Sequence, residues 1–366
     1  MNAASTTARP LTSYALLGRG GLRVSPLALG AMTFGQGADE ETAREMVRRY
    51  LDAGGNFIDT ANGYGEGRSE ELLGAILREA GSRDRVVLAT KFSAPTDPTD
   101  PNAFGNGRKN ILAALDASLR RLQTDYVDLY WLHLWDGMTP VEEVMATFDA
   151  LVRDGKVRAV GLSNVPAWYA ARAQTLAALR GWEPVTALQF EYSLVEREVE
   201  REHIPAALDL GMSIVPSSPL AFGFLSGKYA RGEHGPVGEG RLSRPPYDSP
   251  LVRRVRRQPG DREWALLDAV REVASEVERS PAQVALNWVA RRPGVGSTLV
   301  GATGVGQLSD NLAALDFDLA PELVARLDEA GRPELVPPYT VFDPEVRRMF
   351  LDGRYDVQAA PNRHGA

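Results

Sequence analysis

The sequence contains no cysteine among its 366 residues. This absence excludes disulfide bonds, thiolate nucleophiles, zinc–cysteine sites and iron–sulfur clusters. Histidine is scarce, and the four histidines do not show the spacing of metal ligands. We therefore expect no metal site and no catalysis by a thiol.

Excess positive charge and long apolar runs are also missing. The net charge is -7, so the chain lacks the basic footprint of a general nucleic-acid-binding protein. No run approaches the roughly 18 apolar residues that a membrane span needs. The first ten residues lack the apolar segment of a secretory signal. These absences predict a cytoplasmic protein that binds neither nucleic acid nor membrane.

Short apolar runs alternate with helical patterns along most of the chain. The runs are apolar on both faces, which is typical of strands in a buried parallel sheet. Each run is followed by a segment with helical periodicity, and one helix opens at Ser280 with an N-cap, a proline and a glutamine in its first turn. The eight predicted strands lie at 27–30, 57–59, 85–91, 126–133, 157–164, 185–192, 213–219 and 297–301. The predicted helices cover 40–53, 69–80, 109–122, 141–153, 166–179, 199–210, a segment from 280 and 307–315.

Eight strand–helix pairs predict an α/β protein with a (β/α)8 TIM barrel. A doubly wound sheet is the rival, but "LALGAMTFG" at 27–35 does not match its glycine-rich fingerprint. We expect a single barrel domain over 1–366, with the barrel at about 25–330 and a tail at 331–366. An N-terminal hairpin at 14–25 would plug one end of the barrel.

Long loops account for the extra length of the chain. The segments 93–107 and 221–260 are rich in Pro, Gly and charged residues, and loops of this length tend to be lids or binding elements. We expect them on the C-terminal face of the barrel. The arginine run 253–257 is interpreted as a solvated surface.

Polar residues follow several predicted strands at the point where each strand ends. Asp59, Lys91 and His133 occupy such positions, and Tyr64 lies in the loop after Asp59. The C-terminal rim is where a barrel of this kind assembles its active site. Taken singly, each residue has an ordinary explanation, such as a turn, a surface charge or a packed ring. Their occurrence on neighbouring strand ends favours a common site.

These four residue types suit the protonation of an oxygen atom. A lysine ammonium would lower the pKa of a nearby phenol, and a carboxylate would keep the lysine charged. A histidine could hydrogen-bond a carbonyl oxygen and orient it. The set contains neither an activated serine nor a pair of carboxylates, so it does not point to acyl transfer or glycoside hydrolysis.

Seven ordered segments resemble the aldo-keto reductases, most closely the bacterial and potassium-channel-β-like branch. They are "GGNFIDTANGYGEGRSEELLG", "LATKFS", "YVDLYWLHLWD", "VRAVGLSN", "LQFEYSLVER", "VPSSPLAFGFLSGKY" and "GATGVGQLSDNLAAL". The resemblance covers about residues 16–330. It implies a (β/α)8 fold, a nicotinamide cofactor and carbonyl reduction. It also implies a catalytic tetrad of Asp59, Tyr64, Lys91 and His133, with Tyr64 as the acid.

The resemblance further implies where the cofactor and the substrate bind. The carboxamide would contact Ser163, Asn164 and Gln189, and Tyr192 would stack on the nicotinamide. The remaining predicted cofactor residues are Gly30, Met32, Ser218, Pro219, Leu220, Gly223, Ser226, Lys228, Arg241, Gly301, Thr303, Gln307, Asp310 and Asn311. The predicted substrate pocket is lined by Met32, Tyr64, Phe34, Phe92 and Trp135.

One departure from the family pattern bears on the cofactor. Many members carry a Lys or Arg after the last strand for the 2′-phosphate of NADP, whereas "GATGVGQ" at 301–307 has none. Thr303 and Gln307 can donate only neutral hydrogen bonds. Lys228 or Arg241 could supply a charge from the long loop. We expect NADP, with NAD as the alternative.

The leading hypothesis is an NADP(H)-dependent reductase of a small-molecule aldehyde or ketone. Two alternatives stay open at this point: a reductase of nucleotide-linked keto-sugars in secondary metabolism, and a non-catalytic subunit that senses the nucleotide. A homo-oligomer is a further expectation. The sequence selects neither the substrate nor the direction of the reaction.

Overall fold

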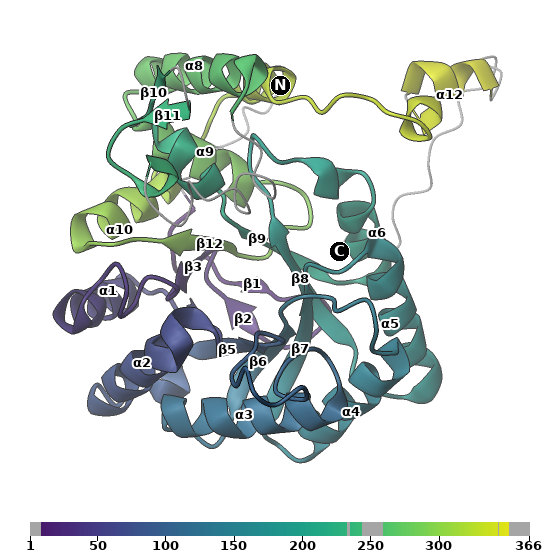
Figure 1. The fold of residues 1–366 in the computed structure, drawn as a ribbon. Helices are drawn as coiled ribbons and strands as arrows, with labels where there is room; N and C mark the ends of the chain where they lie inside the picture. Colours follow the sequence, from purple (N-terminus) through teal and green to yellow (C-terminus); the bar gives the residue numbers. More distant parts are fainter. Residues whose placement is uncertain (1–8, 233–234, 244–258, 343, 351–366) are drawn as a thin grey trace.

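Eight parallel strands form a nearly closed barrel that is surrounded by helices (Figure 1). The computed structural model describes residues 9–232, 235–243, 259–342 and 344–350. The strand order is β12-β3-β4-β5-β6-β7-β8-β9. Backbone hydrogen bonds between Ile214 of β9 and the segment just before β12 join the two ends, from Ile214 N to Gly294 O (2.7 Å) and from Gly296 N to Ile214 O (2.9 Å). The predicted TIM barrel is therefore confirmed.

The observed elements follow the predicted order closely. The barrel strands are β3 (Leu27–Gly30), β4 (Phe57–Asp59), β5 (Val87–Phe92), β6 (Val127–Leu132), β7 (Val157–Ser163), β8 (Val185–Glu191), β9 (Ser213–Ser217) and β12 (Thr298–Gly301). The helices that match predictions are α1 (Glu40–Asp52), α2 (Arg68–Glu79), α3 (Arg108–Leu122), α4 (Val141–Arg153), α5 (Ala167–Arg180), α6 (His203–Leu210), α9 (Pro281–Ala290) and α10 (Val305–Leu312). Helix α6 begins later than predicted, because a separate 3-10 turn occupies Glu198–Glu200.

Besides α12 (Pro344–Phe350) in the tail, two further helices of the described residues are absent from the sequence prediction. They are α8 (Asp261–Glu276), which precedes α9, and α11 (Pro321–Ala330), which follows the barrel. Trp264 and Val270 of α8 are buried, so this helix belongs to the packed outer layer. The tail adds the 3-10 turn η7 (Tyr339–Phe342) and the helix α12 (Pro344–Phe350), which projects from the barrel in Figure 1.

The interior of the barrel is a small apolar core with its own plug. The strands β1 (Ala15–Leu16) and β2 (Arg23–Val24) form the predicted antiparallel hairpin. Leu17 and Val24 from this hairpin join inward-facing barrel residues such as Ala89 and Trp131 in one buried cluster. A side chain at Gly161 would collide with the Trp131 ring, because its Cβ would lie 2.3 Å from that ring. Glycine therefore makes room for the largest residue inside the barrel.

A larger core lies between the strands and the helices. Side chains alternate between the two faces of each strand, so neighbouring residues enter different cores. On β5, Val87 and Ala89 belong to the inner cluster, whereas Leu88 and Phe92 belong to the outer one. This alternation decides which strand-end side chains face the mouth of the barrel.

The long segment after β9 places structure over the C-terminal rim. It forms the 3-10 turn η4 (Ala221–Ser226), the hairpin β10 (Ala230–Gly232) with β11 (Gly235–Val237), and the turn η5 (Arg241–Ser243). The predicted loop location is thus correct, although the loop has more regular structure than expected. The arginine run 253–257 lies outside the described residues.

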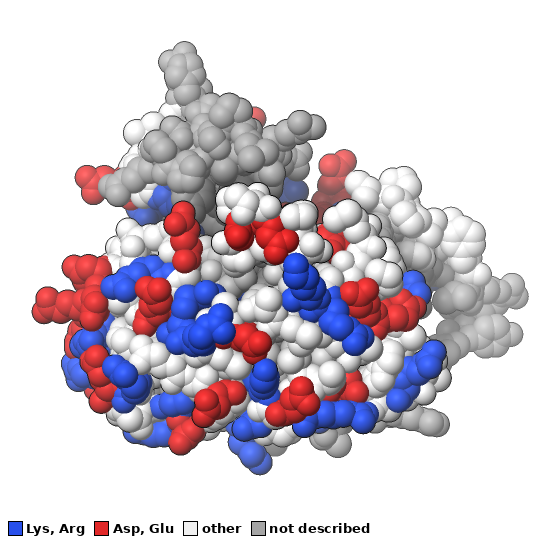
Figure 2. All heavy atoms as spheres, turned by 60° about the horizontal axis from the view of Figure 1, so that its bottom comes forward, with Lys and Arg blue, Asp and Glu red and all other residues white. Residues whose placement is uncertain are grey.

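The surface carries charges of both signs. Figure 2 shows lysine and arginine interspersed with aspartate and glutamate on the face that is turned forward there. Many of these charges pair across neighbouring elements, for example Arg44 with Glu79 (2.5 Å) and Lys156 with Asp116 (2.9 Å). Within the described part of the chain, no helix combines the length and apolar character that a bilayer crossing demands.

Candidate active site

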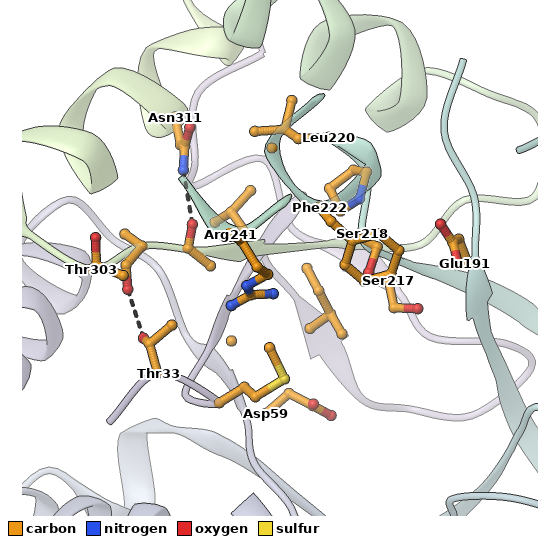
Figure 3. Close-up of a pocket in the computed structure, with 18 of the residues that line it drawn as sticks. Thr33, Asp59, Glu191, Ser217, Ser218, Leu220, Phe222, Arg241, Thr303 and Asn311 are labelled. Carbon is orange, nitrogen blue, oxygen red and sulfur yellow. Dashed lines mark hydrogen bonds between the residues drawn. The ribbon is translucent and has the colours of Figure 1, made fainter. Parts of the chain in front are cut away.

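A cavity of about 430 Å³ opens at the C-terminal ends of the barrel strands. Its wall comes from β3, β4, β8, β9 and β12 and from the loops that follow them (Figure 3). Gly30 and Asp59 line one part, and Gln307 and Asn311 of α10 line another. The cavity therefore lies where a barrel of this kind assembles its chemistry.

A buried ion pair lies beside this cavity. Asp59 ends β4 and is 1% exposed, and Lys91 near the end of β5 is fully buried. The Lys91 ammonium donates to the Asp59 carboxylate, to the backbone oxygen of Thr60 (2.8 Å) and to the phenolic oxygen of Tyr64 (3.4 Å). An ammonium group has three N–H bonds. All three are thus used, which fixes the position of the lysine nitrogen.

Tyr64 is presented to the cavity by a tight turn after β4. Gly65 and Gly67 have φ values of 57° and 94°, in the left-handed region that glycine adopts without steric cost. The phenolic oxygen accepts a hydrogen bond from Lys91. Because that bond occupies a lone pair, the phenolic hydrogen stays available for an acceptor in the cavity. Tyr64 is therefore positioned as a proton donor.

Burial determines the protonation states of this group. Burial raises the pKa of Tyr64, although the Lys91 charge opposes the shift. Lys91 lowers the pKa of Tyr64, as predicted, but desolvation is the larger effect, so the net shift is upward. Burial lowers the pKa of Lys91, but Asp59 and Tyr64 reverse this effect, so the net shift is upward. The phenol and the ammonium both hold their protons at neutral pH.

His133 lies at the end of β6, next to the phenol. Its ring centroid is 5.8 Å from that of Tyr64 in an edge-to-face arrangement. Burial, assisted by the Lys91 charge, lowers the pKa of His133 to about 3. The imidazole is thus neutral near pH 7. A neutral imidazole can donate one N–H to a carbonyl oxygen without competing as an acid.

The turn after β9 forms one wall of the cavity. Ser218, Ala221, Phe222 and Gly223 have φ values of 49°, 46°, 58° and 93°. The N–H groups of Ala221 and Gly223 hold the turn itself, where they donate to Ser218 O (2.8 Å) and Leu220 O (2.9 Å). Lys228 also lines the cavity, and Figure 3 shows Arg241 reaching into it. The positive charges of Lys228 and Arg241 on this side of the cavity fit the negative charge of a diphosphate.

The far end of the cavity is neutral and has open space. The Gln307 carbonyl oxygen accepts from Thr303 N (2.9 Å), and Asn311 donates to Gly301 O (3.2 Å). A Cβ at Gly301 would contact no other group. Thr33 of the β3 loop donates to Ala302 O (2.6 Å), which ties the two sides of this end together. Amide and hydroxyl groups in this arrangement suit a nucleoside.

The family model for the aldo/keto reductase family matches residues 26–332. The chain belongs to the aldo/keto reductase family. Among similar proteins is an uncharacterized oxidoreductase, YrpG, of Bacillus subtilis, which is 38% identical over 86% of this chain and 95% of its own length. An aryl-alcohol dehydrogenase [NADP(+)] of Phanerodontia chrysosporium is 32% identical over 84% of this chain and 83% of its own.

A third relative has a different kind of name. A probable voltage-gated potassium channel subunit beta of Oryza sativa is 36% identical over 86% of this chain and 95% of its own length. The predicted resemblance to this branch of the aldo/keto reductases is confirmed. The family and its oxidoreductase-named members support an oxidoreductase, and the family typically uses NAD(P)H.

Most residues that the sequence assigned to this aldo/keto reductase site do line the cavity. They are Gly30, Met32, Asp59, Tyr64, His133, Asn164, Gln189, Ser218, Pro219, Leu220, Gly223, Lys228, Arg241, Gly301, Thr303, Gln307 and Asn311. Lys91 lies behind the wall and acts through its hydrogen bonds to Asp59 and Tyr64. The structure thus brings the four tetrad residues together.

Three predicted cofactor residues have other tasks in this aldo/keto reductase. Ser163 is buried beneath the wall, where its hydroxyl accepts from Asn164 (3.0 Å). The Ser226 hydroxyl donates to Gly223 O (2.7 Å) and holds the η4 turn. The Asp310 carboxylate accepts from Gln283 (2.9 Å) and docks α10 on α9. These residues shape the wall and do not line it.

The predicted stacking role of Tyr192 is wrong. Gln189 faces the cavity, so Tyr192, three positions later, falls on the opposite face of the chain. Its ring packs against Trp288, and its hydroxyl donates to Glu200 (2.7 Å). The side chain is fully buried in the outer core.

The predicted aromatic substrate wall is corrected at Phe34 and Phe92, whereas Trp135 stays a prediction. Phe34 and Phe92 are fully buried in the outer core, and Phe92 packs against Tyr130 and Phe148. Phe92 follows the inward-facing Lys91, so strand alternation turns it outward. Trp135 is half-buried and packs edge-on against Trp168. Met32 and Tyr64 do line the cavity.

Several cavity residues were not predicted. They are Thr33, Glu191, Phe222, Leu286, Leu299, Val300 and Ala302. Glu191 lies two positions after Gln189, so alternation along β8 was a sequence signal for it. No comparable signal marks Leu286, which comes from helix α9.

Proposed function

We propose that this protein reduces an aldehyde or ketone to the alcohol with NADPH. The observation that carries the proposal is the phenol of Tyr64, which accepts from Lys91 and is thereby left with its hydrogen for the cavity. A proton donor is needed where negative charge develops on a carbonyl oxygen. A nicotinamide cofactor, when bound, supplies the hydride.

Each tetrad residue has a defined role in this reaction. Tyr64 donates its proton to the carbonyl oxygen, and Lys91 stabilises the negative charge that remains on the phenolic oxygen. His133 is neutral and donates a hydrogen bond that orients the substrate oxygen. Asp59 keeps Lys91 charged and in place.

The residues of the cavity fit a dinucleotide along its length. Asn164 and Gln189 lie near the tetrad and would hold the carboxamide. Lys228 and Arg241, which line the cavity beside the turn at Gly223, would hold the diphosphate. Thr303, Gln307 and Asn311 would hold the adenosine end. This assignment rests on the donor set alone.

The choice of NADPH over NADH rests on the family and on cations from the long loop. Thr303 and Gln307 are neutral, so the preference should be modest. The hydrogen bond between the Tyr64 phenol and the Lys91 ammonium supports a catalytic role. A protein that only senses the nucleotide does not need such a proton donor. No feature of the cavity favours a nucleotide-linked sugar as the substrate.

The remaining expectations belong to the same proposal. We infer a small-molecule ligand and no nucleic acid, supported by the alternation of charges in Figure 2. A cytoplasmic location and a homo-oligomer stay predictions.

A titration of the purified protein with NADPH and NADH, followed by fluorescence, tests the cofactor. Loss of absorbance at 340 nm with a panel of aryl and alkyl aldehydes and ketones tests the reaction. Binding without turnover of any carbonyl would favour the sensing role. Absence of binding for both nucleotides would refute the proposal.

A further inference from the structure

Gln189 makes a hydrogen bond that no cofactor role requires. Its amide nitrogen donates to Oδ2 of Asp59 at 3.3 Å, and both side chains are buried, at 4% and 1% exposure. The other oxygen of the same carboxylate, Oδ1, accepts from Lys91. The Asp59 carboxylate is thus held from two sides, by a cation on one oxygen and by an amide on the other.

The contact spans the mouth of the barrel. Asp59 ends β4, and Gln189 lies on β8. These strands are four positions apart in the ring of eight, so they face each other across the barrel axis. Lys91, in contrast, reaches Asp59 from the adjacent strand β5. Gln189 is therefore the support that fixes the carboxylate on its far side.

The two ends of the Gln189 side chain face different groups. A carboxylate can only accept hydrogen bonds, so the NH2 group of the amide points to Asp59. The carbonyl oxygen lies on the other branch of the amide, and Gln189 lines the cavity. Gln189 therefore borders the cavity and also contacts Asp59, which is linked by hydrogen bonds through Lys91 to Tyr64.

We propose that Gln189 is a positioning residue, which holds Asp59 against Lys91 and thereby supports proton donation by Tyr64 from the opposite side of the barrel. The inference rests on the proposed function, because it concerns the same acid. A ligand that donates a hydrogen bond to the Gln189 carbonyl oxygen would orient the amide. Occupation of the cavity would then also set the geometry of the acid.

The other charged and titratable groups near Asp59, Lys91 and Tyr64 come from several elements. Lys91 approaches Tyr64 from β5, His133 from the end of β6, and the Arg241 charge acts on Tyr64 from η5. Glu191 lines the same cavity two residues after Gln189. None of these groups changes in a substitution at Gln189, so a pH effect of that substitution can be assigned to the new side chain and Asp59.

The substitution Gln189→Glu separates positioning from cofactor contact. A carboxylate can still accept a hydrogen bond from a carboxamide, so a pure cofactor role predicts nearly unchanged nucleotide affinity and kcat. Beside Asp59, however, the new carboxylate has no hydrogen to donate until it binds a proton. The neighbouring negative charge raises the pKa of the introduced group. Gln189→Met has a similar size and cannot donate at any pH.

We expect Gln189→Glu to lower kcat at saturating NADPH roughly 10- to 100-fold at pH 8, since small misplacements of catalytic groups cost about this much. The loss should shrink as the pH falls towards 5. Gln189→Met should show a loss that does not change with pH. The control Gln307→Glu makes the same chemical change at the far end of the cavity and should alter nucleotide affinity without a pH-dependent loss of kcat.

A second measurement does not depend on turnover. The Tm of the protein without nucleotide, measured from pH 5 to 8, should fall for Gln189→Glu relative to wild type as the pH rises, by several degrees. The corresponding difference for Gln307→Glu should stay flat. A flat Tm difference for Gln189→Glu, or a kcat that equals wild type at pH 8, would overturn the inference. A wild type that reduces no carbonyl refutes the proposed function instead, and the Tm series then still decides whether Gln189 and Asp59 interact.

Discussion

Two groups of side chains near the C-terminal rim each consist of a tyrosine, a carboxylate and a cation. The Tyr64 triad consists of Tyr64, Asp59 and Lys91, and the Tyr192 triad consists of Tyr192, Glu200 and Arg197. In the first, the cation donates to the phenolic oxygen. In the second, the phenol donates to Glu200 (2.7 Å), and Arg197 binds that carboxylate through two nitrogens (3.0 Å each).

The direction of one hydrogen bond separates a potential acid from a structural contact. In the Tyr192 triad the phenolic hydrogen is committed to Glu200, and the ring packs against Trp288. Burial and the neighbouring Glu200 raise the pKa of Tyr192. In the Tyr64 triad the phenol accepts from Lys91 and borders the cavity. Composition alone therefore does not define a proton donor.

The largest difference between the triads should appear when each phenol is removed. Tyr64→Phe is expected to lower kcat for carbonyl reduction by roughly 10²- to 10⁴-fold, the range of general acid catalysis. The Kd for NADPH should change little, because the phenolic proton is needed only in the transition state. Steady-state kinetics and fluorescence titration measure the two quantities.

The matched variant Tyr192→Phe should retain kcat. It should lose about 1 kcal/mol of unfolding free energy, the typical value of one hydrogen bond. Equal kcat values for the two variants would show that the triads do not differ in function.

Replacing the cation should break the ion pair in either triad, but only the loss of Lys91 should stop carbonyl reduction. Lys91→Met leaves the buried Asp59 carboxylate without its cation, which costs about 3–5 kcal/mol of unfolding free energy. Arg197→Met should cost less, because the Glu200 side chain is 24% exposed and still has Arg292 at 3.9 Å. Lys91→Met should also lower kcat at least 100-fold, because Tyr64 loses the charge that stabilises its phenolate. Urea unfolding and kinetics at saturating NADPH test this. A Lys91→Met enzyme with wild-type kcat would remove Lys91 from the acid chain.

Histidine gives the Tyr64 triad a pH signature that the Tyr192 triad lacks. The pKa of His133 is about 3 in the folded protein, against about 6.5 in an unfolded chain. Between these values the unfolded chain binds the proton more tightly, so stability rises with pH and falls as the pH drops below about 6.5. The expected contribution is about 1 kcal/mol per pH unit between pH 5 and 6.5.

Urea unfolding at several pH values should show this dependence in wild type and in Tyr192→Phe. It should be weaker in His133→Asn, which has no group that titrates in this range. An identical pH dependence in His133→Asn would mean that other groups control acid stability.

The smallest predicted effect concerns the neutral end of the cavity. Gly304 has an extended backbone and open space at its Cβ position, so the structure accommodates a side chain there. Gly304→Arg should tighten NADPH binding roughly three- to tenfold through a charge-assisted hydrogen bond, and leave NADH binding nearly unchanged. Dissociation constants for both nucleotides decide this. An equal gain for NADH would show that the arginine does not contact the 2′-phosphate.

Local sequence patterns were sufficient for the barrel and for the polar residues at its strand ends, whereas the tetrad was assigned from the family resemblance. Apolar runs and helical periodicity are local signals, and the positions of Asp59, Lys91 and His133 follow from where strands end. Helix α8 was missed because it directly follows the long insertion 221–260 and lies outside the strand–helix alternation. The adenosine end was predicted at Thr303, Gln307 and Asn311, but Asp310 was misassigned, since one step along a helix turns a side chain by about 100°.

What the sequence determined by itself is the order of elements and the type of chemistry available at each strand end. Tertiary structure decided which side chains face the cavity and in which direction each hydrogen bond runs. The physical reason is that the side of a strand on which a residue lies depends on alternation within that strand. The direction of a hydrogen bond depends instead on which partner group the fold brings near. Tyr192 donates to Glu200 across a turn, and Gln189 reaches Asp59 from 130 positions away. Contacts of the second kind arise only when the barrel closes.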